Sequence, residues 1–306
     1  MLRYLQQRFI AALITLFGIT IIVFAILRML PGDPARVIAG LLATQEDVER
    51  LRVQLGLDQP MLIQYANFLG NLLRGDLGIS ARTSQPVLDE VMARLPATMQ
   101  LAVVSMLIAA LIGIPVGVIA ATRRNSILDY ILSIITLFGV SMPVYWLGLM
   151  LIVIFAVNLQ LLPAAGNEKI ESLILPSLTL AAFSIALIAR MTRSSMLEVL
   201  HQDYVRTARA KGLRERGVVF RHALQNAFIP VITVLGLQFG TLLGGAVLTE
   251  SVFGWPGIGL LMLDSIFARD YPVVQGVVFI FAAMFIGLNV AVDVLYAYID
   301  PRIHYG

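Results

Sequence analysis

The stretch RTARAKGLRERGVVFRHAL, residues 206–224, lies between two apolar runs that are each long enough to cross a bilayer. It holds six arginines and lysines and a single acidic residue, Glu215. Charge is scarce elsewhere, since 13% of the 306 residues are charged and 58% are hydrophobic. Soluble domains usually carry about 25% charged residues. The composition therefore indicates a membrane protein with one concentrated basic loop.

Six apolar segments have the length of a membrane-spanning helix, for which about 20 residues suffice. These segments cover residues 9–30, 98–121, 130–157, 173–192, 229–249 and 274–297. The third contains Pro143, so we expect it to be kinked. The first is longer than the apolar core of a signal peptide, and we interpret it as a retained span. The predicted fold is an all-α integral membrane protein with six transmembrane helices.

Basic residues beside the spans predict the orientation of the chain. Arg3 and Arg8 precede the first span, Arg123 and Arg124 separate the second from the third, and Arg302 follows the last. Arginine and lysine accumulate in short cytoplasmic loops. Both termini and the basic loop are therefore predicted to be cytoplasmic.

The long segment 31–97 falls on the outer side by alternation and has its own helical signals. Thr44 is a predicted N-cap with Asp47 three residues later, and Gly56 is a predicted stop. A second short helix is expected from Pro60 to Gly75. We expect two amphipathic helices that cap the outer mouth. The predicted regions are an N-terminus with the first span (1–30), a helical outer loop (31–97) and a five-helix core (98–306) that contains the loop 200–228.

Residues for catalysis or for holding a cofactor are not evident in the sequence. It lacks the G-x-x-x-x-G-K-[ST], H-E-x-x-H and G-x-S-x-G patterns, it has no cysteine, and its three histidines are scattered. We expect no catalytic, cofactor or metal site. Ionisable residues are also missing at mid-membrane depth, which disfavours a proton-driven carrier. Asp293 is expected either to extend its carboxylate to the inner membrane surface or to pair there with Arg302 or Arg190.

The basic loop itself allows two interpretations. Asp203 can cap a short helix that Gly212 would end in a left-handed turn. One interpretation is an ordinary inner loop that anionic lipids attract. The other is a docking surface for a protein, which the small residues Thr207, Ala208 and Ala210 favour because they leave the helix backbone approachable.

Eight motifs, taken in order, make the whole chain resemble a known family: the permease subunits of bacterial ABC importers for dipeptides, oligopeptides, glutathione or nickel. They are LPGDPA (30–35), LGLDQP (55–60), GDLGIS (75–80), RTARAKGL (206–213), RHALQNAFIPVIT (221–233), ESVFGWPGIG (250–259), RDYP (269–272) and DVLYAYIDPRI (293–303). The resemblance implies a non-catalytic chain of the bacterial inner membrane that forms half of a transport path.

In such permeases the basic loop is a coupling loop that lodges in a cleft of the ATPase subunit. Importer permeases broadly show Glu-Ala-Ala, three residues, then Gly; here Ala208 and Gly212 match, whereas Arg206 and Thr207 replace Glu and the first Ala. The usual downstream Leu-Pro is altered, because proline arrives only at Pro230. The coupling residues that the resemblance implies are Asp203, Arg206, Thr207, Ala208, Arg209, Ala210, Lys211, Gly212, Arg221 and His222.

The resemblance also implies partners. These are a second, homologous permease subunit, two ATP-binding subunits that hold ATP and Mg, a periplasmic solute-binding protein and the lipid bilayer, with no nucleic acid. The substrate stays open among peptides, glutathione and nickel chelates. A self-contained carrier or channel is the alternative function, and a structural assembly or insertion factor is a third.

The short outer loop SVFGWPGIG (251–259) also leaves two interpretations open. It is either a tight turn or, through an exposed Trp255, a contact for the binding protein. The acidic and basic residues around it either line an outer vestibule or keep the loop hydrated. The candidate gate or binding-protein contacts are Glu250, Trp255, Pro256, Arg269 and Asp270. Elsewhere, Gly113 and Gly117 are expected to permit close helix packing.

Overall fold

The computed structural model describes residues 2–29, 33–40, 43–54 and 56–299. Within them the chain is helical, with one isolated antiparallel bridge between Ile79 and Pro86. Residue contacts divide the chain into two compact units, which are described separately. The first comprises residues 1–98 and 256–287, and the second comprises residues 99–255 and 288–306.

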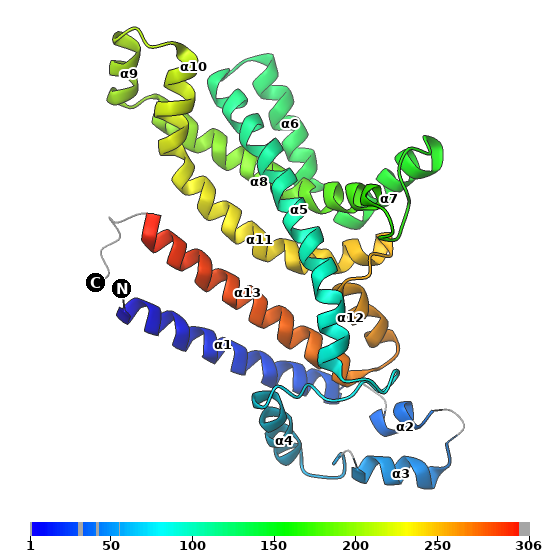
Figure 1. The fold of residues 1–306 in the computed structure, drawn as a ribbon. Helices are drawn as coiled ribbons and strands as arrows, with labels where there is room; N and C mark the ends of the chain where they lie inside the picture. The colour runs from blue at the N-terminus through cyan, green and yellow to red at the C-terminus, as the bar shows by residue number, and fades with distance from the viewer. Residues whose placement is uncertain (1, 30–32, 41–42, 55, 300–306) are drawn as a thin grey trace. The chain divides into compact units, whose positions relative to one another are not determined.

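The first unit contains α1 and the short helices of the long segment that follows it (Figure 1). Its helices are α1 (Leu2–Met29), α2 (Pro34–Ala39), α3 (Gln45–Gln54), α4 (Met61–Leu73) and α12 (Ile258–Phe267), while α5 (Val87–Thr122) and α13 (Tyr271–Ile299) contribute to both units. A core of buried aliphatic side chains joins α5, α12 and α13 within this unit. It includes Val87, Val91, Ile258, Leu261, Val273 and Val277.

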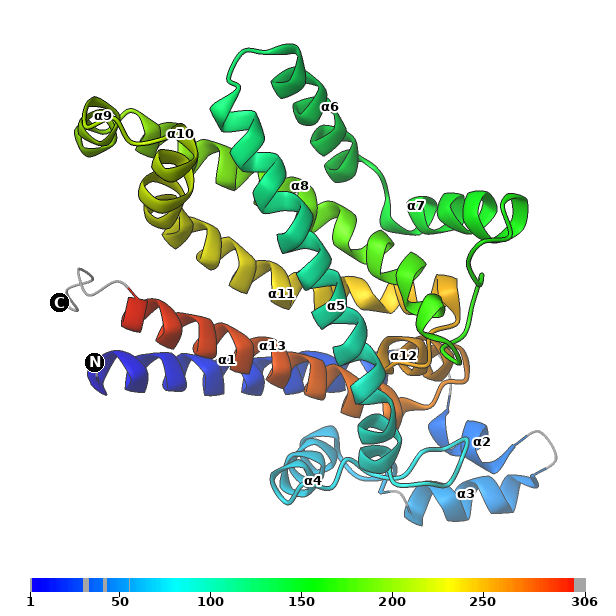
Figure 2. The same cartoon turned by 45° about the horizontal axis from the view of Figure 1, so that its top comes forward.

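The second unit contains the remaining helices. They are α6 (Ile127–Ser141), α7 (Val144–Leu151) with its π-helical continuation η1 (Ile152–Asn158), the 3₁₀ turn η2 (Ile170–Leu173), α8 (Ile174–Leu200), α9 (Asp203–Ala210), α10 (Glu215–Gly217), the π-helical η3 (Val218–Leu224) and α11 (Gln225–Phe253). Helices α8 and α11 run side by side in both views (Figures 1 and 2).

Within the described residues, five helices are long and apolar enough to cross a membrane, and a sixth span results if the bent pair of α6 with α7 and η1 is counted as one. The bend is 107° and falls at the break before Val144. Pro143 has an extended backbone there, with φ −60° and ψ 133°, and proline has no amide hydrogen to continue a helix. The predicted all-α fold is confirmed, and so is a change of direction at Pro143. The bend of 107° is, however, far larger than the kink that we expected.

The segment 31–97 contains three short helices rather than the two that we expected. The additional helix is α2, which begins where the Asp33 side chain accepts from the Ala35 amide and Pro34 occupies the first helical position. The cap of α3 is confirmed: the Asp47 amide donates to Thr44 Oγ1 at 3.3 Å, and the Thr44 amide donates to Asp47 Oδ2 at 3.1 Å. We missed α2 because its apolar pattern is too short to register as helical.

In the second unit, α5 packs directly on α8 through its glycines. A Cβ atom placed on Gly113 would lie 2.9 Å from the Ile185 carbonyl oxygen, and one on Gly117 would lie 2.5 Å from the Ala189 carbonyl oxygen. Real Cβ atoms do not approach so closely, so only glycine fits at these two positions. The close packing predicted for Gly113 and Gly117 is confirmed.

Candidate functional site: the basic loop and a neighbouring arginine cavity

Helix α9 lies at the tip where the chain turns back from α8 towards α11, as both views show (Figures 1 and 2). Val205 is fully buried and Ala208 is 6% exposed, and both pack against the buried Val218. Val199 and Leu200 at the end of α8 complete this apolar seat. The seat fixes α9 to the ends of α8 and η3, since apolar area removed from water stabilises the contact.

Two details of the predicted loop are wrong. Asp203 is not the cap: Gln202 holds the N-cap position without a side-chain hydrogen bond, and the Asp203 carboxylate lies 3.7 Å from Arg206 Nη1. Ala208 does not leave the helix bare to a partner. It lies three residues after Val205, on the same face of α9, and that face packs on the chain itself.

The predicted left-handed turn at Gly212 is confirmed. Its φ is +77°, and its amide donates to the Arg209 carbonyl at 2.9 Å. Across this turn the Arg209 Nη2 donates to Glu215 Oε1 at 2.8 Å. Hydrogen bonding to that carboxylate raises the pKa of Arg209 above its ordinary value. The turn thus joins the two halves of the loop by an ion pair as well as by its backbone.

The side of α9 that faces away from the seat is exposed, and its residues are either small or basic. We call Arg206, Thr207, Ala210 and Lys211, which are all exposed, the docking face. Arg221 is exposed and His222 half-buried further along η3. A cavity of about 460 Å³ opens beside this face. Its lining is Ala121, Arg124, Leu197, Leu200, His201, Arg206 and Arg209.

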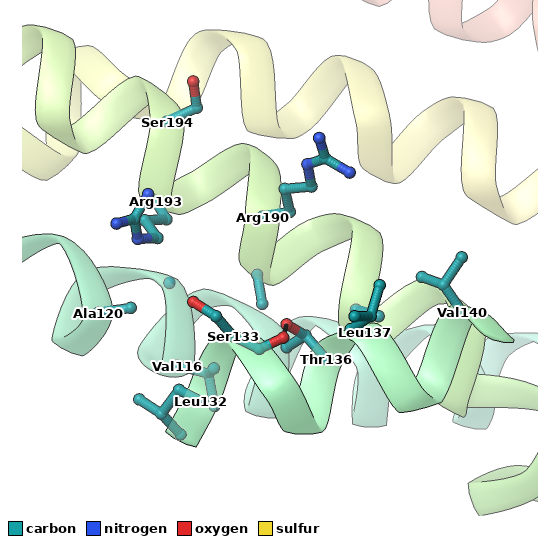
Figure 3. A pocket seen from close by; sticks show the side chains of 13 residues that line it. Val116, Ala120, Leu132, Ser133, Thr136, Leu137, Val140, Arg190, Arg193 and Ser194 are labelled. Carbon is teal, nitrogen blue, oxygen red and sulfur yellow. Dashed lines mark hydrogen bonds between the residues drawn. The ribbon is translucent and has the colours of Figure 1, made fainter. Parts of the chain in front are cut away.

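A second cavity, of about 370 Å³, lies among α5, α6 and α8 and is lined by two arginines of α8 (Figure 3). Arg193 Nε donates to Asp129 Oδ1 and Arg193 Nη2 donates to Asp129 Oδ2, both at 2.8 Å, and the Asp129 side chain is 4% exposed. Arg190 is exposed, and its guanidinium points in a different direction from that of Arg193 (Figure 3). No sequence pattern indicated the Arg193–Asp129 pair, whose members are 64 residues apart.

The candidate contact residues of the short outer loops differ in their exposure to solvent. Arg269 is exposed and Pro256 is half-buried, whereas Glu250 is fully buried. The expectation of an exposed Trp255 is wrong, because this residue is 2% exposed. Gly254, with φ +57°, ends α11 and turns the chain back, so that the Trp255 amide donates to the Glu250 carbonyl at 2.9 Å.

Asp270 is also buried, at 2% exposure, within the first unit. Its carboxylate accepts from Ser80 Oγ at 2.6 Å and from the amides of Ala81 and Arg82 at 3.1 and 3.2 Å. The hydrogen-bonding capacity of this carboxylate is therefore used within the chain. The pairing that the sequence suggested for Asp293 with Arg302 or Arg190 lies outside the described residues.

The chain matches two family profiles. Residues 113–305 match the binding-protein-dependent transport system inner membrane component, and residues 1–102 match the N-terminal part of such membrane components. The glutathione transport system permease protein GsiC of Escherichia coli (strain K12) is 47% identical over 305 residues, which cover 100% of both chains. The dipeptide transport system permease protein DppB of Alkalihalophilus pseudofirmus is 44% identical over 333 residues, again with 100% of both chains covered.

Solved structures support the fold. An inward-facing structure of the MetNI methionine ABC transporter has a chain that superposes with a TM-score of 0.62 at 21% identity, over 71% of this chain and 100% of that one. An amino acid ABC transporter gives a TM-score of 0.51 at 17% identity, over 71% of this chain and 95% of that one. The profiles and the full-length relatives together place the chain: it belongs to the family of inner membrane components of binding-protein-dependent transport systems, as a multi-pass, non-catalytic permease subunit of an ABC importer.

Proposed function

We propose that this chain forms half of the translocation path of an importer for glutathione or short peptides, and that the loop 200–228 couples this path to ATP hydrolysis. Full-length relatives named for glutathione and dipeptide transport, at 47% and 44% identity, support this substrate class. A second, homologous permease subunit would supply the other half of the path. Two ATP-binding subunits would hold ATP and Mg, and a periplasmic binding protein would deliver the solute.

The construction of α9 is the observation that carries the coupling role. The helix is fixed to α8 and η3 by the seat around Val205 and Ala208, while the docking face points away from that seat. A displacement of α9 is therefore passed to α8 and, through η3, to α11. When ATP closes the two partner subunits, their clefts would move, and α8 and α11 would move with them. The path would then open alternately to the two sides of the membrane.

This role fixes the orientation of the chain. The docking face must reach subunits in the cytoplasm, so the termini are cytoplasmic, the segment 31–97 is periplasmic, and Arg269 is the accessible candidate for contact with the binding protein. Basic residues in the cytoplasmic loops agree with this orientation.

A matched pair of substitutions tests the coupling role. Ala210→Trp places a bulky side chain on the docking face, and Ala164→Trp places the same side chain on an exposed loop before η2. Each variant is co-expressed with its partner permease, ATPase and binding-protein subunits. We expect Ala210→Trp to lose co-purification of the ATPase subunits and solute uptake, with membrane insertion intact, and Ala164→Trp to retain both.

Full uptake by the Ala210→Trp variant would contradict the coupling role. Solute uptake by this chain reconstituted alone in vesicles would contradict the whole proposal, because a self-contained carrier needs no ATPase partner.

A further inference from the structure

Helix α8 has one uncovered stripe. From Phe183 to Leu200, the exposed residues are Phe183, Arg190, Ser194 and Glu198, and the half-buried Leu187 lies between the first two. These five residues follow one another at intervals of three or four and so share one face of the helix. The stripe is apolar towards the start of the helix and polar towards Leu200. Polar side chains in a span seldom face lipid, so the second half of this stripe is suited to a water-filled path.

Arg190 and Arg193 lie in contrasting surroundings although they are three residues apart. Arg193 is neutralised by two hydrogen bonds to Asp129. Arg190 forms no ion pair with any side chain in the described part of the chain. Arg190 lies in the second half of the candidate span Ile170–Leu200, ten residues or about 15 Å of helix before Leu200. A cation inside a candidate span that has no ion-pair partner among the described residues is a candidate for a functional position.

Arg190 lines two cavities. It lines the cavity of about 370 Å³ among α5, α6 and α8, where the hydroxyl groups of Ser133 and Thr136 also lie (Figure 3). It also lines a cavity of about 400 Å³ between α8 and α11. Ser194, one turn further along α8, lines both. The Thr136 hydroxyl already donates to the Ser133 carbonyl at 2.9 Å, which leaves the Arg190 guanidinium and the hydroxyl groups of Ser133 and Ser194 as candidate donors to an anion.

We propose that Arg190 binds a carboxylate of the transported solute in the inner half of the path. This inference rests on the proposed function. A guanidinium binds a carboxylate through two parallel hydrogen bonds, which a lysine cannot reproduce. Short peptides and glutathione carry a carboxylate that is ionised at neutral pH. Arg193 is less suited to this role because its Nε and Nη2 already donate to the Asp129 carboxylate, which balances its charge.

Ligand affinity of the nucleotide-free importer complex tests this inference. The complex is placed in nanodiscs of zwitterionic lipid without the binding protein, and binding of radiolabelled dialanine, its C-terminal amide and reduced glutathione is measured. We expect the complex to bind dialanine about tenfold more tightly than the amide. Arg190→Gln should abolish this difference, and Arg190→Lys should retain part of it. Arg74→Gln, which removes an exposed arginine beyond α4, is the matched control and should retain all of it.

Several outcomes would overturn the inference. One is the absence of any preference of the wild-type complex for the acid over the amide; another is an unchanged preference in Arg190→Gln. If Asp293→Asn reproduced the effect of Arg190→Gln, an internal ion pair would explain it instead. Loss of the second permease subunit from Arg190→Gln would indicate a contact between subunits, and loss of the preference in anionic nanodiscs would indicate a lipid headgroup. Each of these leaves the coupling role, tested by Ala210→Trp, untouched.

Discussion

The basic loop 200–228 and the turn around Asp270 are both fixed in place, but by opposite means. Around Asp270 a buried carboxylate accepts three hydrogen bonds from residues 80–82, so its charge is used inside the first unit. In the basic loop the buried contact is apolar, through Val205, Ala208 and Val218, and the charged side chains are exposed, including the Arg209–Glu215 pair. A charged residue in a loop therefore does not by itself indicate a contact surface. Only a charged side chain that is exposed can contact a partner.

The largest effect is expected from removing the buried carboxylate. Asp270→Ala leaves the Ser80 hydroxyl and two amides without their acceptor, which should lower the free energy of unfolding by about 3 kcal/mol. Thermal unfolding of the purified protein in detergent measures it. Asp264→Ala, at a half-buried position of α12, is the control and should change stability little. An unchanged unfolding temperature for Asp270→Ala would show that these hydrogen bonds do not hold the segment.

A smaller loss is expected from overfilling the seat of α9. Ala208→Leu adds three heavy atoms between Val205 and Val218, which should cost about 2 kcal/mol locally and displace the helix. Because the chain has no cysteine, Thr207→Cys provides a unique maleimide site on the docking face. Its labelling rate should rise in Ala208→Leu and stay constant in the exposed control Ala210→Leu. Equal rates would mean that the seat does not position α9.

A further substitution would strain the left-handed turn at Gly212 without causing a steric clash. No atom lies within 4 Å of a Cβ placed on Gly212, so Gly212→Asp acts through its φ of +77° and costs about 1 kcal/mol. We expect ATP hydrolysis to continue while uptake falls. Gly212→Asn, which tolerates a left-handed backbone better, should retain more uptake. Wild-type uptake in Gly212→Asp would remove the turn from the coupling mechanism.

The smallest effect is expected at the ion pair across that turn. Arg209 and Glu215 have side chains that are 40% and 62% exposed, so salt screens their attraction and the pair contributes about 0.5 kcal/mol. Arg209→Gln should lower uptake slightly at low salt and not at high salt. Glu215→Gln should match it, and the double variant should be no worse. Additive effects would indicate that the two residues act separately, each on the partner.

Local signals predicted much of the fold. The Thr44–Asp47 cap, the turn at Gly212, the break at Pro143 and the close packing at Gly117 all depend on a few neighbouring residues or on the absence of a side chain. Apolar length was enough to indicate the spans.

The parts that were missed depend on distant pairs. Ser80 and Asp270 are 190 residues apart, and no periodicity links them. The same holds for Asp129 and Arg193. The burial of Ala208 was missed for another reason: small residues suit both a bare surface and a tight contact, and only Val218, ten residues later, settles which one applies.

The glycines of α5 have a consequence for how motion spreads. At Gly113 and Gly117 α5 contributes no side chain, and its backbone lies directly against Ile188 and Thr192 of α8. The two helices therefore have little room to shift relative to each other at these positions. A displacement of α8 that begins at one of its ends should therefore also displace the part of α5 that contacts it. Spectroscopic labels on either side of this contact should keep a constant separation during turnover, even while the rest of the path is remodelled.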